Sequence, residues 1–421
     1  MNRRQAVGSL LGAVGAVGLG LRGAPSAQAA PQRPDRQERP LSLEPFEIDF
    51  SAQVIEDLHR RIDRVKWPEM PFDTGWSAGT ADHVLRDLVD HWRNEYDWFS
   101  VQANLNELTH LRGPIEGDLL HCVIYDRGGQ EAAASNFPLL LLHGWPGSFH
   151  DFHDVAPRLS EGVDGAAGFK LIIPSLPGYV FSDTPREVGM GPGRIAERLH
   201  QLMLELGHDR YGVQGGDWGG IIATEMARVY PDALVGLHLN FVGVAPPPPD
   251  GVDPSPEEVA YREARARFQG NETGYSRIQG TRPQTLAYAQ QDSPVGWLAW
   301  MLEKYWAWSE HGDDLWETFS RDDILTTAML YWLPGRILSA ARLYYESSNP
   351  LPGSRAGGRV EVPTGYARFP SEPWAPPRDV VERTYNLVRY SEPLRGGHFP
   401  ALEQPALWSG EVSRFFSSLQ L

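Results

Sequence analysis

Cysteine is almost absent from this sequence of 421 residues, which contains only Cys122. A single thiol cannot form an intramolecular disulfide, and a structural zinc site built on thiolates needs several of them. Basic residues are also in the minority, since 38 Lys and Arg stand against 54 Asp and Glu for a formal net charge of −16. Because a surface of this sign repels phosphate groups, we expect neither nucleic acid nor acidic lipid as a partner.

The sequence also lacks an apolar run of the roughly 20 residues that a membrane span takes. The uncharged, Gly-rich stretch at residues 6–21 is shorter; it follows Arg3-Arg4 and precedes the small residues 27–29. This order is typical of a signal peptide, and the paired arginines favour the twin-arginine type over an ordinary secretory signal or a disordered leader. We therefore expect a signal peptide at 1–29, a polar, Pro-rich linker at 30–42, and an exported protein, periplasmic or secreted, without a membrane span.

The remaining composition is that of a globular protein with an apolar pocket. Hydrophobic residues make up 41% of the chain and charged residues 22%, which fits neither a disordered chain nor a membrane bundle. The stock of 14 Trp, 15 Tyr and 16 Phe is larger than a core needs. Since aromatic side chains also line ligand pockets, it indicates a pocket for an apolar ligand.

Periodicity divides the chain into a helical first part and a mixed second part. Apolar residues recur at helical spacing in residues 43–120, which predicts a helical N-terminal region. From 121 to 245, short apolar runs alternate with helical segments, as is typical of a parallel sheet covered by helices. The expected helices lie at 51–65, 81–96, 100–108, 193–206 and 221–230, and the expected strands at 121–125, 137–142, 169–174, 210–215 and 234–244.

A Pro-rich stretch interrupts this rhythm, and residues 246–350 are aromatic and helical, with Ser293-Pro294 as the predicted start of one helix. Residues 351–421 resume the earlier pattern with strands at 360–362 and 385–390 and a helix at 406–416. The predicted fold class is therefore α/β: a mostly parallel sheet covered by helices, with a helical cap insertion and a helical N-terminal extension.

The segment Gly-Gly-Asp-Trp-Gly-Gly at 215–220 comes where an expected strand turns into an expected helix. Small residues on both sides of Asp217 let strand and helix pack closely around a strained residue, as in the nucleophile elbow G-x-S-x-G. A carboxylate in place of the serine needs no base to deprotonate it, and its attack on carbon leaves an ester on the enzyme. The alternative is a Gly-rich turn whose Asp caps a helix.

The segment His-Gly-Trp-Pro-Gly-Ser at 143–148 directly follows the Leu-rich strand. In α/β-hydrolases the loop after this strand gives one main-chain N–H to the oxyanion hole, and the residue after the nucleophile gives the other. The donors are then the main-chain N–H groups of Trp145 and Trp218. Taken alone, the segment favours an ordinary β-turn.

His398 lies after the last expected strand and before the last expected helix. Since the chain order in this fold is nucleophile, acid, histidine, His398 stands where the general base belongs. The acid that orients it should follow the preceding strand, where Glu372 and Asp379 are both candidates.

Two further patterns carry no cofactor. The segment His-Asp-Phe-His-Asp at 150–154 has residue types that bind metals, but its spacing is weak evidence and a helix start explains its acids. Gly-Pro-Gly at 191–193 lacks the Gly-Lys-Ser/Thr of a phosphate loop. We therefore predict neither a metal nor an organic cofactor.

From about residue 43 to its end, the sequence resembles α/β-hydrolases of the epoxide hydrolase family, in the microsomal-type branch with an N-terminal extension. The resemblance implies Asp217 as nucleophile, His398 as general base and Glu372 as the orienting acid. It rests on the two loops and the histidine segment above and on matching stretches at 65–68, 96–98, 105–106, 292–296, 329–332 and 362–365.

The resemblance further implies that Tyr275 and Tyr344 hold the epoxide oxygen, with Tyr345 as the neighbour that could take the place of Tyr344. The implied reaction converts a small apolar epoxide and water into a vicinal diol without a cofactor, in detoxification or in the catabolism of aromatic hydrocarbons. A haloalkane dehalogenase of the same fold is the closest alternative, and a non-catalytic ligand binder is a more distant one. The oligomeric state stays open, with a homodimer among the options.

Overall fold

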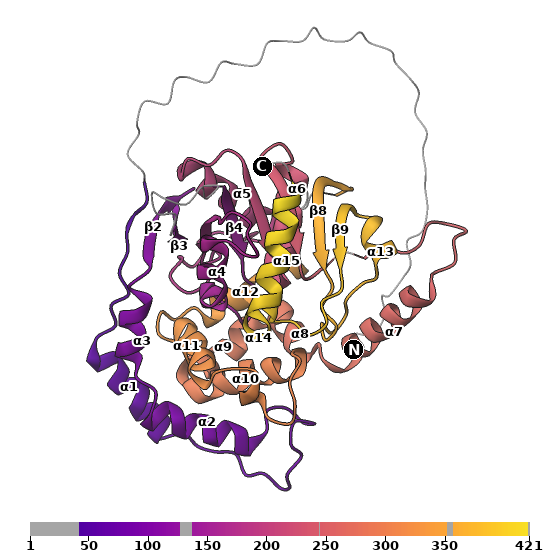
Figure 1. The fold of residues 1–421 in the computed structure, drawn as a ribbon. Helices are drawn as coiled ribbons and strands as arrows, with labels where there is room; N and C mark the ends of the chain where they lie inside the picture. Colours follow the sequence, from indigo (N-terminus) through magenta and orange to yellow (C-terminus); the bar gives the residue numbers. More distant parts are fainter. Residues whose placement is uncertain (1–41, 127–136, 244, 352–356, 420–421) are drawn as a thin grey trace, which may run out of the picture. The chain divides into compact units, whose positions relative to one another are not determined.

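The computed structural model describes residues 42–126, 137–243, 245–351 and 357–419 (Figure 1). The predicted signal peptide, and the predicted linker up to residue 41, lie outside the described residues. Among the described residues, no helix is long and apolar enough to cross a membrane.

A sheet of nine strands runs through the described chain in the order β1-β2-β3-β5-β4-β6-β7-β8-β9. The strands from β5 to β9 are parallel to one another, whereas β3 pairs antiparallel with β5. This confirms the predicted α/β class with a mostly parallel sheet. The strands are β1 Glu44–Pro45, β2 Thr109–Ile115, β3 Asp118–Tyr125, β4 Pro138–Leu142, β5 Lys170–Pro174, β6 Tyr211–Gly215, β7 Leu234–Leu239, β8 Val360–Ala367 and β9 Tyr385–Ser391.

Helices cover both faces of the sheet: α5 packs against α6, and α15 packs against α4. Figure 1 shows α15 in front of the sheet and α6 behind it. Strands β4 and β6 are buried along their whole length, which explains why their sequences do not alternate between polar and apolar. The helices of this part are η1 Phe149–Phe152, α4 Val155–Glu161, α5 Pro192–Glu205, α6 Asp217–Val229, α13 Arg378–Glu382, α14 Pro400–Glu403 and α15 Pro405–Ser418.

Helix α15 lies close to the sheet because the strands beneath it carry glycine. A Cβ atom on Gly212 of β6 would lie 2.4 Å from the ring of Phe416, and one on Gly365 of β8 would lie 2.5 Å from the ring of Phe415. Both rings are fully buried. The close seating fixes α15, whose first turn carries Trp408 to the same end of the sheet as the loops after β6 and β7.

Among the described residues between β7 and β8, the cap consists of six α-helices and a short 3-10 helix. As predicted, Ser293 caps one of them, since its hydroxyl accepts a hydrogen bond from the N–H of Gly296. The cap helices are α7 Pro256–Asn271, α8 Gly274–Thr281, α9 Pro283–Asp292, α10 Pro294–Trp308, η2 Leu315–Glu317, α11 Arg321–Trp332 and α12 Ile337–Ser348.

The N-terminal region contains the helices α1 Ala52–Asp63, α2 Asp82–Asn94 and α3 Trp98–Leu105, and the first two contact the cap. Helix α1 contacts α10, and α2 contacts α11. Between α1 and α2, the indole of Trp76 stacks on that of Trp306, with ring centroids 4.5 Å apart. The buried Tyr96 hydroxyl bonds to Thr326 of α11 at 3.0 Å. Through these contacts the N-terminal region packs against the cap, which its sequence alone did not predict.

Besides the two-residue strand β1, the region predicted to be helical contains the longer strand β2. β2 forms a hairpin with β3, and its turn residues Glu116 and Gly117 both have positive φ angles, of 50° and 97°. Two such residues make the turn whose twist suits a hairpin. The strand escaped prediction because Gly113 and Pro114 interrupt it. Strand β7 is also shorter than expected and ends at Leu239.

Candidate active site

Asp217 occupies a sharp turn between β6 and α6 and has a φ angle of +46°, which is strained for a residue with a side chain. The glycines on either side make the turn sterically feasible. A Cβ atom on Gly215 would lie 2.4 Å from the main-chain oxygen of Gly219, and one on Gly219 would lie 2.1 Å from that of Leu142. The turn therefore has the steric features of a nucleophile elbow.

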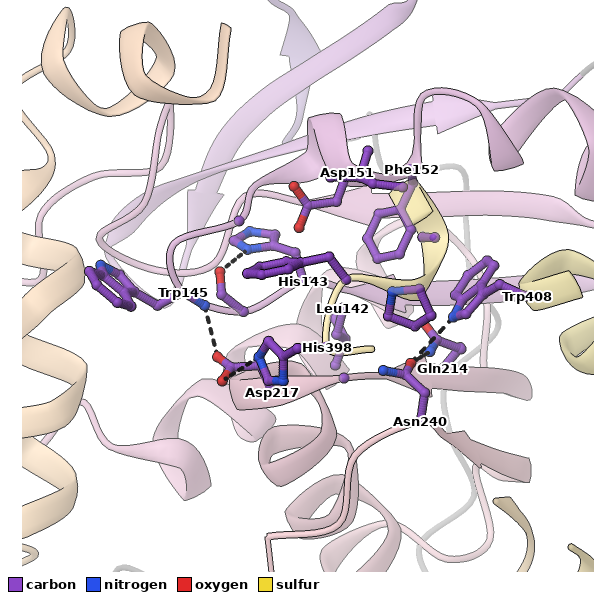
Figure 2. A pocket seen from close by; sticks show the side chains of 17 residues that line it. Leu142, His143, Trp145, Asp151, Phe152, Gln214, Asp217, Asn240, His398 and Trp408 are labelled. Atoms are coloured by element: carbon purple, nitrogen blue, oxygen red, sulfur yellow. Dashed lines mark hydrogen bonds and ion pairs between the residues drawn. The ribbon is translucent and has the colours of Figure 1, made fainter. Parts of the chain in front are cut away.

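Both carboxylate oxygens of Asp217 have partners from other segments (Figure 2). Oδ1 accepts a hydrogen bond of 2.8 Å from the main-chain N–H of Trp145, and Oδ2 lies 3.3 Å from Nε2 of His398. The main-chain N–H of Trp145, one of the two predicted oxyanion donors, thus lies against the Asp217 carboxylate. Trp218, the other, follows Asp217 in the first turn of α6, where main-chain N–H groups have no partner within the helix.

His398 joins Asp217 to a second carboxylate. Its Nδ1 lies 2.8 Å from Oε2 of Glu372, whose side chain is 2% exposed. The other candidate acid, Asp379, instead accepts a hydrogen bond from Ser255 at 3.0 Å. The geometry therefore places Glu372, and not Asp379, where it can orient the imidazole.

The pKa of His398 is raised to about 10 by its two carboxylate neighbours. Burial acts in the opposite direction, because it disfavours the charged imidazolium, but the charge of Glu372 and the bond to Asp217 together outweigh it. At neutral pH, His398 therefore holds a proton between Glu372 and Asp217. Since Asp217 contributes to this shift, any change in its charge alters the basicity of His398.

The loop that carries His398 is tied to the end of cap helix α10. The N–H of His398 donates to the carbonyl oxygen of Trp308 at 2.8 Å. The buried carboxyl of Glu403 accepts three hydrogen bonds of 2.7 Å, from the N–H groups of Gly397 and Phe399 in the loop and of Glu310 in the cap. We call this set of bonds the cap–histidine clasp. It fixes the position of His398 relative to the cap.

The two cap tyrosines named above lie together beside Trp145. The ring of Tyr275 stacks on the Trp145 indole at 5.2 Å, and the ring of Tyr344 meets the same indole edge-on at 5.8 Å. Tyr344 also contacts the indole of Trp218 at 4.8 Å, whereas Tyr345 lies under the guanidinium of Arg342. Burial is the main cause that raises the pKa of both phenols, Tyr275 and Tyr344, and the nearby charge of Asp217 adds to it.

A cavity of about 50 Å³ adjoins Asp217 and His398 and is shown in Figure 2. Asp151, Gln214 and Asn240 are further polar residues of its wall. Burial raises the pKa of the Asp151 carboxyl to about 7. The sequence argument did not single out these three residues as functional, although Asp151 lies in the segment considered for metal binding and Gln214 lies three residues before Asp217.

That segment does bring metal-binding residue types together. Nε2 of His150 and of His153 lie 3.1 and 3.5 Å from the same carboxylate oxygen of Asp323. The two imidazole planes, however, are 9° from parallel and their centroids are 4.4 Å apart. A shared ion would have to lie near both ring planes, which stacked rings do not allow without turning. The arrangement is better described as a hydrogen-bonded cluster around Asp323.

Two family descriptions match the chain. Residues 43–152 match the epoxide hydrolase N terminus, and residues 138–251 match the alpha/beta hydrolase fold. A homologue from Stigmatella aurantiaca is 38% identical over 89% of this chain and 85% of its own length. Epoxide hydrolase 1 of Sus scrofa is 34% identical over 90% of this chain and 89% of its own length.

Solved structures agree with these sequence matches. The juvenile hormone epoxide hydrolase of the silkworm Bombyx mori superposes with a TM-score of 0.82 at 30% identity, over 91% of this chain and 96% of that chain. The Aspergillus niger epoxide hydrolase superposes with a TM-score of 0.78 at 29% identity, over 90% and 97% of the two chains.

Proposed function

The chain belongs to the epoxide hydrolase family and hydrolyses epoxides, and we propose that it does so through a covalent ester on Asp217. One observation carries this mechanism. Asp217 lies at a strained turn with one oxygen on the Trp145 N–H, and its other oxygen is 3.3 Å from a histidine that Glu372 holds. This arrangement supplies a nucleophile, an oxyanion donor and a base within one contact shell.

In the first step, Asp217 attacks a carbon of the epoxide ring. The C–O bond of the ring breaks, and the oxygen leaves as an alkoxide that takes a proton from Tyr275 or Tyr344. Because burial raises the pKa of both phenols, they stay protonated and can donate until the ring opens. The product of this step is a hydroxyalkyl ester of Asp217.

In the second step, His398 loses its proton and becomes a base. Esterification removes the negative charge of Asp217, one of the groups that raise the pKa of His398. The imidazolium then releases its proton, which restores the tyrosine that lost one. Neutral His398 takes a proton from water as the water oxygen bonds to the ester carbon, while Trp145 and Trp218 hold the oxyanion. As the ester bond breaks, the proton that remains on the added water oxygen passes to the departing alkyl oxygen. The diol leaves, Asp217 is again a carboxylate, and His398 is again an imidazolium.

The substrate that fits this site is a small apolar epoxide. Aromatic rings that contact one another lie beside the loop whose N–H donates to Asp217, and they include those of Trp145, Tyr275, Trp308 and Tyr344. An aromatic surface of this kind favours an apolar substrate, and the two phenols can donate hydrogen bonds to the epoxide oxygen.

The test is a single turnover in water enriched in oxygen-18. Purified protein in molar excess is mixed with one of a panel of aryl, alkyl and terpene epoxides, and the peptide that contains Asp217 is analysed by mass spectrometry. We expect the label in Asp217 and an unlabelled first-turnover diol, because water attacks the ester carbon. Label in the diol alone would refute the ester mechanism.

Asp217→Ala is the control, for which we expect no diol. Haloalkanes are included in the panel, and alcohol formed from them with no diol from any epoxide would assign the dehalogenase reaction instead. Tight binding without turnover of any compound would support the ligand-binding alternative.

We also propose that the protein is exported by the twin-arginine route and acts in detoxification or in the catabolism of aromatic hydrocarbons. The order of Arg3-Arg4, an uncharged stretch and small residues supports export by this route. Cell fractionation of the full chain tests it, with Arg3→Lys plus Arg4→Lys as the variant expected to stay in the cytoplasm. Equal export of both chains would contradict the twin-arginine route.

A further inference from the structure

Lys304 lies in α10 and plays no part in the mechanism above. Among the residues of α10, all of them described, it is the only charged one that is buried, with an exposed fraction of 4%. Its Nζ lies 4.6 Å from the centroid of the Tyr275 ring and 5.4 Å from that of Trp308. The face of an aromatic ring attracts cations, and it does so more strongly where water is excluded. A positive charge is therefore held against one of the two cap tyrosines.

Lys304 also forms an ion pair with Glu303, its neighbour in α10. The side chain of Glu303 is 24% exposed and that of Lys304 only 5%, so water screens the carboxylate more than the ammonium. A buried ion pair is weak evidence of a stabilising role, because removing two charges from water offsets their attraction. The pair alone therefore does not explain why a lysine stands against the ring of Tyr275.

The charge of Lys304 matters when the epoxide ring opens. As Asp217 attacks, its negative charge passes to the alkoxide and then to the phenol that gives up a proton. The carboxylates of Asp217, Glu303 and Glu372 raise the pKa of Tyr275, so they disfavour this charge on its oxygen. An ammonium against the ring acts in the opposite direction, because its attraction to the ring grows when the phenol becomes a phenolate.

The two cap tyrosines differ in this respect. Among the described residues, no Lys or Arg side chain stands over the ring of Tyr344. That ring contacts the uncharged rings of Trp145, Trp218 and Tyr275 instead. A phenolate is therefore better stabilised on Tyr275 than on Tyr344.

We propose that Tyr275 gives its proton to the epoxide oxygen and that Lys304 is a positioning residue, which stabilises the phenolate left on Tyr275. The inference rests on the proposed function, since it assigns residues to its first step. The C–O bond of the ring breaks, and the proton moves from Oη of Tyr275 to the alkoxide oxygen. The phenolate regains a proton when His398 releases its own, while Lys304 stays protonated throughout. Tyr344 holds the epoxide oxygen by a hydrogen bond and keeps its proton.

The experiment compares the two chemical steps in Lys304→Met, which keeps an unbranched apolar side chain and removes the charge. Enzyme and excess epoxide are mixed and quenched with acid after milliseconds to seconds, and the rates of both steps follow from the time courses of ester and diol in mass spectrometry. We expect ester formation to slow roughly 10- to 100-fold, the effect of one lost cation–π contact away from water. Ester hydrolysis should not slow, because the phenol is protonated again before that step.

Glu303→Gln is the matched control, because it breaks the same ion pair but leaves the ammonium against the ring. If the pair served only the fold, both variants would behave alike. We expect ester formation in Glu303→Gln to be no slower than in the original protein, since a charge that disfavours the phenolate is gone. Equal slowing in both variants, or the original rate in Lys304→Met, would overturn the inference while leaving the ester mechanism intact. Absence of any ester in the unmodified protein would overturn the proposed function as well.

A second measurement does not depend on how Lys304→Met folds. In single variants, Tyr275→Phe should slow ester formation more than Tyr344→Phe, because only Tyr275 has the cation against its ring. Adding Lys304→Met should slow ester formation further in the Tyr344→Phe protein but not in the Tyr275→Phe protein, since Lys304 acts through the Tyr275 hydroxyl. A larger loss in Tyr344→Phe, or an equal loss in the two single variants, would also overturn the inference.

Discussion

Replacing Glu372 by glutamine tests how the protein controls the basicity of His398. The change keeps the shape of a side chain that is 2% exposed, but it removes the negative charge 2.8 Å from Nδ1 of the imidazole. Burial alone lowers the pKa of His398, and the charge of Glu372 is the largest cause that opposes it. The pKa of His398 must therefore fall in Glu372→Gln.

The size of the effect follows from the bond that is weakened. A hydrogen bond to a charged group contributes about 1.5–3 kcal/mol, which corresponds to a rate change of roughly 10- to 150-fold. We expect ester hydrolysis to slow by this factor, since the base becomes weaker and less well oriented. Ester formation does not use His398 as a base, so it should change much less.

In the assay, enzyme is mixed with excess epoxide and quenched with acid after milliseconds to seconds, and the ester on Asp217 is measured by intact-protein mass spectrometry. The measurement is repeated at pH values between 5 and 10. A base with a lowered pKa loses its proton at lower pH, so the rise of ester hydrolysis with pH should move to lower pH while its plateau falls. Asp379→Asn is the control, because Asp379 bonds to Ser255 and not to His398. Full hydrolysis in Glu372→Gln, or its loss in Asp379→Asn, would refute the assignment of the acid.

Three further outcomes follow from the described geometry. The double variant Tyr275→Phe plus Tyr344→Phe should form no ester with an epoxide, because no phenol remains for the ring oxygen; full activity, followed as diol by mass spectrometry, would contradict the assignment. Gly219→Ala should give no stable protein, since its Cβ would lie 2.1 Å from a main-chain oxygen. Gly270→Ala, with open space in helix α7, should instead gain about 0.5–1 kcal/mol of unfolding free energy, and thermal unfolding separates the two. Because the pKa of Asp151 is raised to about 7, its burial weakens the fold as the pH rises from about 4 through 7. Asp151→Asn should therefore gain stability relative to the original chain between pH 5 and pH 8 in urea unfolding, and a constant difference would show that Asp151 does not titrate in this range.

The parallel part of the sheet was predictable because burial on both faces leaves a plain signal in the sequence. The run at 137–142 cannot alternate, since β4 is covered from both sides. The hairpin β2–β3 gave a weaker signal, because Gly113 and Pro114 interrupt its first strand and the pairing partner decides the structure. Whether these residues form a strand therefore depends more on this long-range pairing than on their local sequence pattern.

The site residues also fall into two groups, those that the local sequence indicated and those that it did not. Asp217 was predictable because a strained turn needs glycines at fixed positions, and these are visible in a sequence. The cap tyrosines were not, since nothing in the local sequence separates Tyr275 and Tyr344 from the others, and only the resemblance selected them. Gln214 could not be singled out as a wall residue of the cavity, because this depends on long-range contacts. It bonds to Asn240, directly after β7, which also accepts from Trp408 of α15.

The cap–histidine clasp restricts how the cap can move relative to the sheet. One main-chain hydrogen bond joins His398 to Trp308, and Glu403 bonds to both segments. Moving the end of α10 away from the sheet therefore requires these bonds to break or the histidine loop to move with it. A cap that opened at this end would take His398, the proposed general base, with it and leave an ester on Asp217 without the residue proposed to activate water. Opening of the cap at this end and hydrolysis of the proposed ester therefore exclude each other in time.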